Sequence, residues 1–359
     1  MTQTRTSLKR SSLILPDGQH KYPPSWLDRF FCWVDSLPIS PWLLYALIGM
    51  ALMAIELAIN WFQGDEPVGT IHFFHVVFVF SVSYGFAAIH YLDREAGKAI
   101  DRFRPALTVN AVEYRELRYR FTTMHPRPVW LATAAGVFVF IAMLITTPLD
   151  LRLRLFQFVN SDLSLLFNDL VSLVVWILCS VGTYHSFHQL RMVSYIYTKY
   201  TRINLFEQRP LYALSGLTAR TSILWIIVAW AWYASVPGLT ETFVSGFAVV
   251  LWVVVAVIMF VWPLMGIHNL LLEAKDRVLF QNRQRLEALV GELHQRIDRE
   301  DLAQMDNFNK ALASIELEFG GLQRIPTWPW HPEAVRGVVA ALIFPLVLWI
   351  MQQFLERIV

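Results

Sequence analysis

The chain has few charged residues for its length. Asp, Glu, Lys and Arg make up 16% of its 359 residues, whereas soluble globular domains carry about 25%. Hydrophobic residues reach 55%, and the mean hydropathy is +0.43. This composition excludes an ordinary soluble domain and indicates a membrane protein. The net charge of +2 does not indicate any class of partner.

Motifs that carry chemistry are also missing. The sequence has no phosphate-binding glycine loop, nucleophile elbow or zinc-protease motif. It has no arginine-rich voltage sensor, potassium-filter signature or strong inverted repeat of interrupted spans. The two cysteines, Cys32 and Cys179, fall on a predicted inner-surface helix and within a predicted span, so we expect no disulfide. We expect no enzyme activity, no cofactor, no bound metal and no nucleic-acid partner.

Long apolar runs are what the sequence does contain. A membrane-spanning helix needs about 20 mostly apolar residues. Seven segments fit, and only the fourth is interrupted near its start, by Asp162 and Asp169. They are Trp42–Phe62, Ile71–Leu92, Val129–Thr147, Leu163–Thr183, Thr218–Val236, Phe243–Ile267 and Ala334–Phe354. The sequence therefore predicts an all-α polytopic membrane protein with seven transmembrane helices.

The positive charges lie on alternate connections between these spans. The segment before span one and the connections after spans two, four and six carry 27 Lys and Arg residues, whereas the other connections and the tail carry 3. Positive residues are retained on the cytoplasmic side of a membrane. The N-terminus is therefore predicted to be cytoplasmic and the C-terminus outside. We expect a multi-pass protein of the cell membrane, in a prokaryotic plasma membrane.

The predicted cytoplasmic segments read as helices. Apolar residues repeat at helical spacing over Trp26–Leu37, which predicts a short helix on the inner leaflet with Asp28, Arg29 and Asp35 off its apolar face. Helical apolar spacing continues beyond span four as far as Tyr200. Span six likewise runs on into a charged helix. We expect the connection between spans two and three to be partly helical and to pack against the hairpin that follows span six.

This hairpin is predicted over residues 268–332. Its first helix carries an oligomer anchor, an apolar seam spaced at 7, 4, 3 and 4 residues in a coiled-coil-like pattern: Leu279, Leu286, Val290, Leu293 and Ile297. The pattern breaks at Asp298–Asp301 and resumes from Leu302 to Leu322. An apolar seam in water must be covered, either by the same chain or by a neighbouring subunit. The chain thus divides into an N-terminal segment (1–41), a six-helix bundle (42–267), the hairpin and a last span (333–359).

Four polar residues lie in the predicted outward half of the spans: Glu56, Asn60, His75 and Asp169. Ionisable groups at membrane depth are costly, so they usually face a wet cavity or a partner. One interpretation is an outer ligand pocket or ion path. The other is local satisfaction, with Asp169 near a helix start and Glu56 paired with a histidine. The sequence does not decide between these two interpretations.

Four histidines lie at similar inner depth: His90, His185, His188 and His268. Four such side chains could ligate a metal ion. Histidine near the headgroups is more commonly a polar tip at the interface, and we favour that interpretation.

The approach to the last span is rich in proline and tryptophan. Ile325–Pro332 holds three prolines and two tryptophans, which predicts an interfacial turn between the cytoplasm and the last span, with a moving hinge as the alternative. Gln352 and Gln353 precede Phe354 near the outer end of that span. An amide in hydrocarbon seeks a partner helix or a wet lumen, unless it simply lies at the interface.

This architecture resembles the superfamily of insect odorant and gustatory receptors and their distant relatives. The last span of that family carries Thr-Tyr, five residues and then Gln-Phe. Gln353 and Phe354 match this pattern, whereas Leu346 and Val347 replace Thr-Tyr and Gln352 is polar within the spacer. The resemblance implies a tetrameric cation channel with a pore-lining last span, subunits joined by cytoplasmic helices, and a ligand pocket in the outer half of spans one to six. The hairpin is longer than that family leads us to expect.

Two functions are therefore expected as alternatives. The first is a homo-oligomeric, tetrameric, cation-conducting channel gated from the outer side, with Gln352, Gln353 and Phe354 at its pore. The second is a non-conducting membrane scaffold or sensor whose hairpin binds a partner. The expected partners are further copies of the chain, the lipid bilayer, and a small-molecule ligand or cation.

Overall fold

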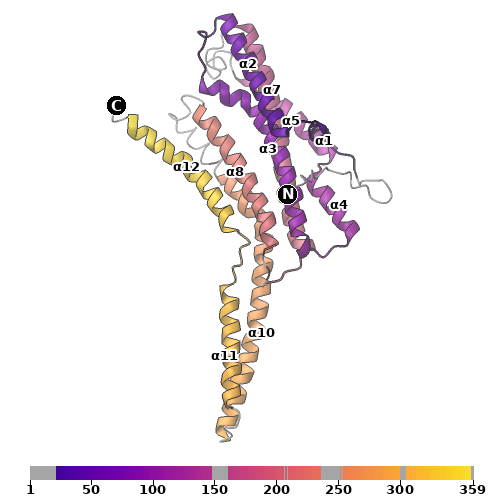
Figure 1. The fold of residues 1–359 in the computed structure, drawn as a ribbon, viewed down its shortest axis with the longest axis vertical. Helices are drawn as coiled ribbons and strands as arrows, with labels where there is room; N and C mark the ends of the chain where they lie inside the picture. The colour runs from indigo at the N-terminus through magenta and orange to yellow at the C-terminus, as the bar shows by residue number, and fades with distance from the viewer. Residues whose placement is uncertain are drawn as a thin grey trace, which may run out of the picture.

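The computed structural model describes residues 22–147, 161–205, 207, 209–235, 251, 254–299 and 305–356. These residues are helical apart from turns and short connections, and they contain no strand, only an isolated bridge between Leu107 and Thr201. The predicted all-α fold is confirmed. Most helices gather in a bundle, and two long helices project away from it (Figure 1).

Six helical segments in the described part of the chain are long and apolar enough to cross a bilayer. They are Pro41–Gln63, Phe73–Ala106, Ala111–Thr146, Asp162–Tyr200, Leu211–Ser235 and Val254–Asp298. Each overlaps one of the first six predicted spans, as expected of a polytopic membrane protein. The seventh predicted span falls in α12 (Pro332–Glu356), whose side chains at 345, 346 and 348–356 lie outside the described residues. The number of spans and their orientation stay predictions.

The helix boundaries follow local sequence signals. Helix α2 (Pro41–Gln63) begins with a proline, which needs no partner for an N–H there, and ends at Gly64 in the left-handed conformation with φ 73°. Helix α5 (Pro126–Thr146) also begins at a proline. Helix α3 (Phe73–Phe103) runs well past its predicted span, and α7 (Asp162–Tyr200) extends to Tyr200 as predicted. Such long helices carry the bundle beyond the thickness of a bilayer.

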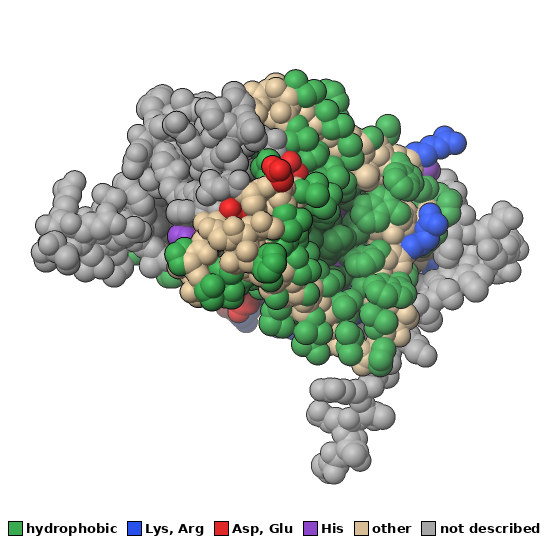
Figure 2. Space-filling model, turned by 90° about the horizontal axis from the view of Figure 1, so that it is seen from above, with side chains coloured by type: hydrophobic (Ala, Val, Ile, Leu, Met, Phe, Trp, Pro, Cys, Tyr) green, Lys and Arg blue, Asp and Glu red, His purple; other side chains and the backbone are tan. Residues whose placement is uncertain are grey.

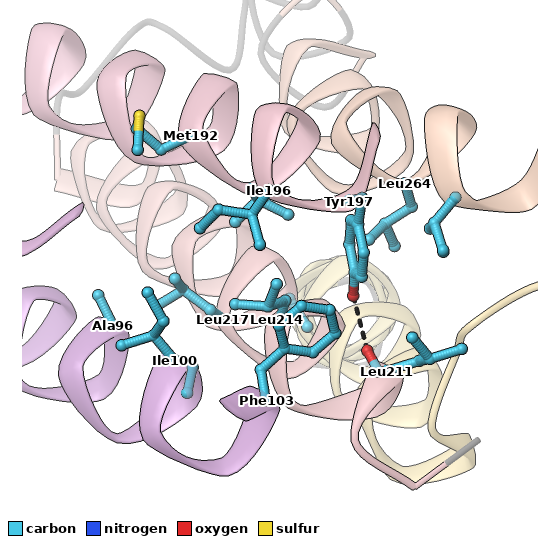
Figure 3. Close-up of a cluster of buried hydrophobic side chains, with 14 of the residues drawn as sticks. Ala96, Ile100, Phe103, Met192, Ile196, Tyr197, Leu211, Leu214, Leu217 and Leu264 are labelled. Atoms are coloured by element: carbon cyan, nitrogen blue, oxygen red, sulfur yellow. Dashed lines mark hydrogen bonds between the residues drawn. The ribbon is translucent and has the colours of Figure 1, made fainter. Parts of the chain in front are cut away.

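The main core lies mostly between α3, α7 and α8 (Leu211–Ser235) (Figure 3). Tyr197 is fully buried there, and its hydroxyl donates a hydrogen bond of 2.6 Å to the backbone oxygen of Leu211. Phe103 meets the Tyr197 ring edge-on, with 5.4 Å between ring centroids. This contact joins α3, α7 and the start of α8 without an unpaired polar group.

Close backbone contact joins α5 to α7. A Cβ atom on Gly136 would lie 2.6 Å from Cα of Ile177 and 2.7 Å from the backbone oxygen of Trp176. Only glycine permits this approach, and such small-residue contacts bring membrane helices together.

The N-terminal helix α1 (Trp26–Ser36) confirms the predicted helix but not its polar face. Leu27, Phe31 and Val34 are buried, as the apolar spacing requires. The prediction that Asp28 lies off this face is wrong. Asp28 is buried because its carboxylate accepts hydrogen bonds from Ser25 in a capping box and from the backbone N–H of Met124. Helix α1 is therefore docked on the bundle.

The connection between α3 and α5 contains a short 3-10 turn, Arg104–Ala106, and helix α4 (Ala111–Thr122). An asparagine cap and a capping box start α4. Its apolar residues Tyr114, Leu117 and Phe121 join the core beside α3 and α7. The prediction that this connection packs against the hairpin is wrong, because α4 uses that apolar face on the bundle.

The predicted hairpin is present. Helix α10 (Met265–Asp298) follows a 3-10 turn, Trp262–Leu264, and α11 (Met305–Arg324) returns beside it. We call Met265–Arg324 the stalk (Figure 1). The arginines Arg283 and Arg296 of α10 lie over Phe319 and Phe308 of α11, which sets an antiparallel register. The predicted seam Leu279, Leu286, Val290 and Leu293 is half-buried, and Ile297, near the tip, is exposed.

An aromatic stack joins the stalk to α12. The ring of His268 stacks on Trp328 at 3.9 Å, Trp328 on Trp330 at 4.5 Å, and Trp330 on Phe260 at 5.6 Å. Lys275 donates hydrogen bonds of 2.8 and 2.9 Å to backbone oxygens at the end of α11, where a positive charge is favourable. The proline-rich turn is therefore fixed by Lys275 at its start and by the aromatic stack of Trp328 and Trp330 nearer α12.

Candidate functional site

Three of the four predicted polar residues meet in one cluster. Glu56 and Asn60 lie one turn apart on α2, and His75 lies in the first turn of α3; all three are buried. His75 Nδ1 contacts Glu56 Oε1. The Glu56–histidine pair that the sequence offered as the alternative to a ligand pocket is therefore present in the structure.

The connection between α2 and α3 adds a second carboxylate. Glu66 is buried, and its Oε1 lies 3.5 Å from His75 Nε2 and 3.6 Å from His72 Nε2. Its Oε2 accepts a 3.2 Å hydrogen bond from the Thr70 hydroxyl. His75 thus lies between two carboxylates, one at each ring nitrogen.

Helix α7 supplies neutral polar partners. The Ser164 hydroxyl lies 2.9 Å from Asn60 Oδ1 and 2.6 Å from Asp65 Oδ2, and the Ser161 hydroxyl donates to the same carboxylate at 2.8 Å. Asn168 is buried one turn later. We call Glu56, Asn60, Asp65, Glu66, His72, His75, Ser161, Ser164 and Asn168 the polar cluster.

Sequence reasoning missed most of this cluster. The spacing of Ser161, Ser164 and Asn168 puts them on one face of α7, which was a usable signal. Asp169, predicted as a member, is one position out of phase with that face and is half-buried. Asn168, not Asp169, takes the buried position.

The end of the bundle that carries the α2–α3 connection is poor in positive charge. Seen from above, this end is mostly hydrophobic with several carboxylates, and Lys and Arg show only at its rim (Figure 2). Residues 41–93 contain no Lys or Arg at all. Among the described residues, the side chains that can bring positive charge to Glu56 and Glu66 are those of His72 and His75.

A cavity lies deeper, between α3, α7 and α8. Its empty space, together with the open solvent at its mouth, amounts to about 560 Å³. Its lining is mostly apolar and includes Tyr84, Leu178, Trp225 and Trp232. Tyr84 donates to the backbone oxygen of Leu224 at 2.7 Å, and Trp225 donates to Ser186 at 2.9 Å. None of Glu56, Asn60, His75 and Asp169 is among its lining residues. The cavity offers shape and apolar surface, because the donor protons of Tyr84 and Trp225 already have partners.

The four inner histidines have separate partners. His185 Nε2 lies 2.9 Å from Asp93 Oδ1, which also accepts from Gln189. His90 bonds Tyr45 and faces Asp35 at 3.2 Å. His188 meets the backbone oxygen of Arg120 at 2.9 Å, and His268 belongs to the aromatic stack. Across the described ranges, no three His, Cys, Asp or Glu side chains are placed to hold a metal ion.

Two carboxylates fasten α1 to the bundle. Burial, followed by the nearby charge of Asp93, raises the pKa of Asp28 to about 6. Burial also acts to raise the pKa of Asp35, but hydrogen bonds and charge from His90 and Arg94 outweigh it, so that pKa is below its ordinary value. Arg94 contacts Asp35 directly. The two attachments of α1 therefore respond to pH in opposite directions.

The predicted pore residues Gln352, Gln353 and Phe354 lie in α12, and their side chains are outside the described residues. Earlier in α12, Val338 is buried, while Val339, Ile343, Phe344 and Val347 are exposed. Among the described elements, α12 packs mainly on α8, and it diverges from α8 toward its C-terminal end (Figure 1).

No protein-family model, curated protein or solved structure matches the chain. Its function therefore has to be inferred from its own residues and geometry.

Proposed function

We propose that the protein is a homo-oligomeric, tetrameric channel that conducts cations and is gated by a ligand on the outer side. Seven spans run from a cytoplasmic N-terminus, the stalk is cytoplasmic, and α12 lines the pore. The resemblance to the odorant-receptor superfamily and the alternation of positive charge along the chain support this proposal.

The observation that supports assembly of several subunits is the exposure of apolar side chains on the stalk. Phe280 on α10 is 60% exposed and Leu317 on α11 is 80% exposed. The charge pattern puts the stalk in water, so lipid cannot cover these side chains. Large apolar side chains exposed to water can be covered by a partner, and neighbouring stalks around an axis would cover them.

The position of α12 supports its role as the pore helix. Among the described residues it rests on α8, leaves several apolar side chains exposed, and follows the aromatic stack of His268, Trp328 and Trp330. A helix at the rim of its own subunit can face its symmetry mates around an axis. Gln352 and Gln353 then replace part of an ion's hydration shell, and Phe354 forms an apolar constriction.

The cavity between α3, α7 and α8 lies deeper than the predicted outer pocket, and a small apolar molecule that enters from the outer side would bind there. Its walls recognise shape, since Tyr84 and Trp225 already donate to protein atoms. It borders α8, the helix on which α12 rests. A ligand opens the pore only if it binds the open state better than the closed one.

Conduction is tested by recording currents from the purified protein in planar bilayers. Wild-type currents are expected, with altered conductance in Gln353→Leu and raised basal opening in Phe354→Ala. The matched control is Phe344→Ala, an exposed residue on the same helix two to three turns earlier. Equal effects of Phe354→Ala and Phe344→Ala would argue against a gate at Phe354.

The non-conducting alternative also has an observation in its favour, because the exposed Phe280 and Leu317 could bind a different protein. Phe280→Asp combined with Leu317→Asp separates the two functions. Loss of a ring of identical subunits supports the channel, whereas an unchanged particle with loss of a different bound protein supports the scaffold. Val112→Asp, a half-exposed residue on α4, is the matched control for adding surface charge.

A further inference from the structure

One part of the polar cluster has no role in the channel proposal. We propose that His72, Glu66, His75 and Glu56 form a proton-binding site that opens at the α2–α3 connection, and that proton binding there fastens this connection. That the site faces outward rests on the topology in the proposed function; that it binds protons does not.

From the surface inward, histidine and glutamate side chains alternate in this site. The side chain of His72 is 36% exposed, whereas Glu66 and His75 are 2% exposed and Glu56 is fully buried. Successive groups are in direct contact or lie within 3.6 Å. A proton can therefore enter at His72 and be shared along the chain.

Hydrogen-bond chemistry requires an added proton at this site. A neutral imidazole has one N–H, and imidazolium has two. His75 faces a carboxylate at each ring nitrogen, so only its imidazolium form can donate toward both. Glu66 Oε1, which lies between the two imidazoles, is buried and accepts no hydrogen bond. A proton on either histidine gives that oxygen a donor.

The described residues of the surrounding helices do not supply a fixed positive charge, and Arg152 and Arg154 of the α5–α7 connection lie outside the described residues. Asp65 lies in the connection itself, and Asp162 and Asp169 lie on α7. Residues 41–93, 128–147 and 161–190 contain no Lys or Arg, which covers the described parts of α2, the connection and the facing halves of α3, α5 and α7. Buried carboxylates need a counter-charge or a proton. For Glu56 and Glu66, histidine protonation is the source of positive charge that the described residues offer.

The connection is built to respond to this charge. Gly64 and Gly69 have φ values of 73° and 96°, so the chain turns back at both points. Between them, the Glu66 side chain is buried and Asp65 contacts the Ser161 and Ser164 hydroxyls of α7, while Trp61 Nε1 donates to the backbone oxygen of Thr70 at the far end. Loss of the proton leaves Glu56 and Glu66 as close like charges, which favours release of the connection.

Hydrogen exchange of the full chain in detergent, read on peptides covering residues 60–75, tests the site. Relative to unstructured-chain rates, wild-type exchange is expected to slow as pH falls from about 8 to 5, where histidine changes charge. The limit is about tenfold per pH unit, for one proton bound in the closed connection and released on opening. His75→Gln is expected to remove this slope, and His331→Gln, on the proline-rich turn, to retain it.

A wild-type protein without the slope, or an equal slope in His75→Gln, overturns the proposal. If His75→Gln does not fold, Glu66→Gln serves as the second variant, since its amide keeps the side-chain shape. A reduced slope in Glu66→Gln supports the site, and an unchanged slope overturns it. Exchange requires no conduction, so silence in bilayers leaves this result intact, and failure here leaves the channel proposal standing.

Discussion

The bundle and the stalk differ in how completely they bury their apolar side chains. In the bundle, Tyr197, Phe103 and Leu214 are buried on all sides within one chain (Figure 3). Beyond its junction with α7, the stalk consists of two helices that lie against each other, its seam is half-buried up to Leu293, and Phe280 and Leu317 remain exposed. Two helices cannot enclose a core, because each has a partner on one side only. The bundle encloses its core within one chain, whereas the described part of the stalk leaves large apolar side chains exposed.

Charged substitutions in the stalk seam are expected to have the largest effect on assembly. Leu286→Asp combined with Leu293→Asp removes about 2 kcal/mol of apolar burial at each position and buries unpaired charge. We expect the oligomer to disperse while the bundle keeps its helices, as measured by particle size and by thermal unfolding in detergent. An oligomer of unchanged size in this variant would show that the seam is covered within one chain.

The next largest effects are expected from substituting one glycine in the bundle and one in the stalk. Gly136→Ala forces a Cβ to within 2.6 Å of the α7 backbone, and overpacking of this kind costs about 1–3 kcal/mol. Gly291 on α10 has open space around it, so Gly291→Ala is expected to stabilise the stalk by up to about 1 kcal/mol. Opposite shifts in the unfolding temperature are expected. Shifts of the same sign would contradict the claim that only the bundle is tightly packed.

The attachment of α1 is expected to depend on pH. Asp28 has a pKa raised from 3.8 to about 6, so the docked helix binds a proton that the undocked helix releases between these values. The contribution of Asp28 to docking is therefore largest below about pH 4, weakens as pH rises to about 6, and is constant above it. Hydrogen exchange of residues 25–36 measures this effect. Asp28→Asn should flatten the profile between these values, and a profile that keeps its slope in that variant would count against Asp28.

The smallest expected effect concerns Asn282. This residue is buried in the stalk, three positions after Leu279, and neither polar atom of its side chain has a hydrogen-bond partner. Replacing a buried unsatisfied amide by leucine is expected to stabilise an isolated stalk by about 1 kcal/mol. If Asn282→Leu instead weakens the oligomer, a neighbouring subunit satisfies the amide, as buried asparagines do when they fix register.

The sequence predicted the elements well and their contacts poorly, for physical reasons. Run length and apolar spacing located six helices that are long and apolar enough to cross a membrane, the extension to Tyr200 and the end of α10 at Asp298, since these depend on local sequence. The burial of Asp28 depends on the N–H of Met124, which lies 96 residues away. No periodicity in α1 contains that information.

The polar cluster illustrates the same division. Glu56, Asn60 and His75 were found because polar residues inside apolar runs are conspicuous. Glu66 was missed because it lies in a connection, where a carboxylate is ordinarily exposed and only the fold reveals its burial. Asn282 was missed because a seam is recognised by its apolar members.

The central claim is that identical subunits surround an axis lined by α12. Single-particle imaging of the detergent-solubilised protein tests it most directly. The account predicts a fourfold ring in which α12 lies nearest the axis and the stalks meet below the bundles. A monomeric particle, or a ring whose axis is lined by another helix, would contradict it.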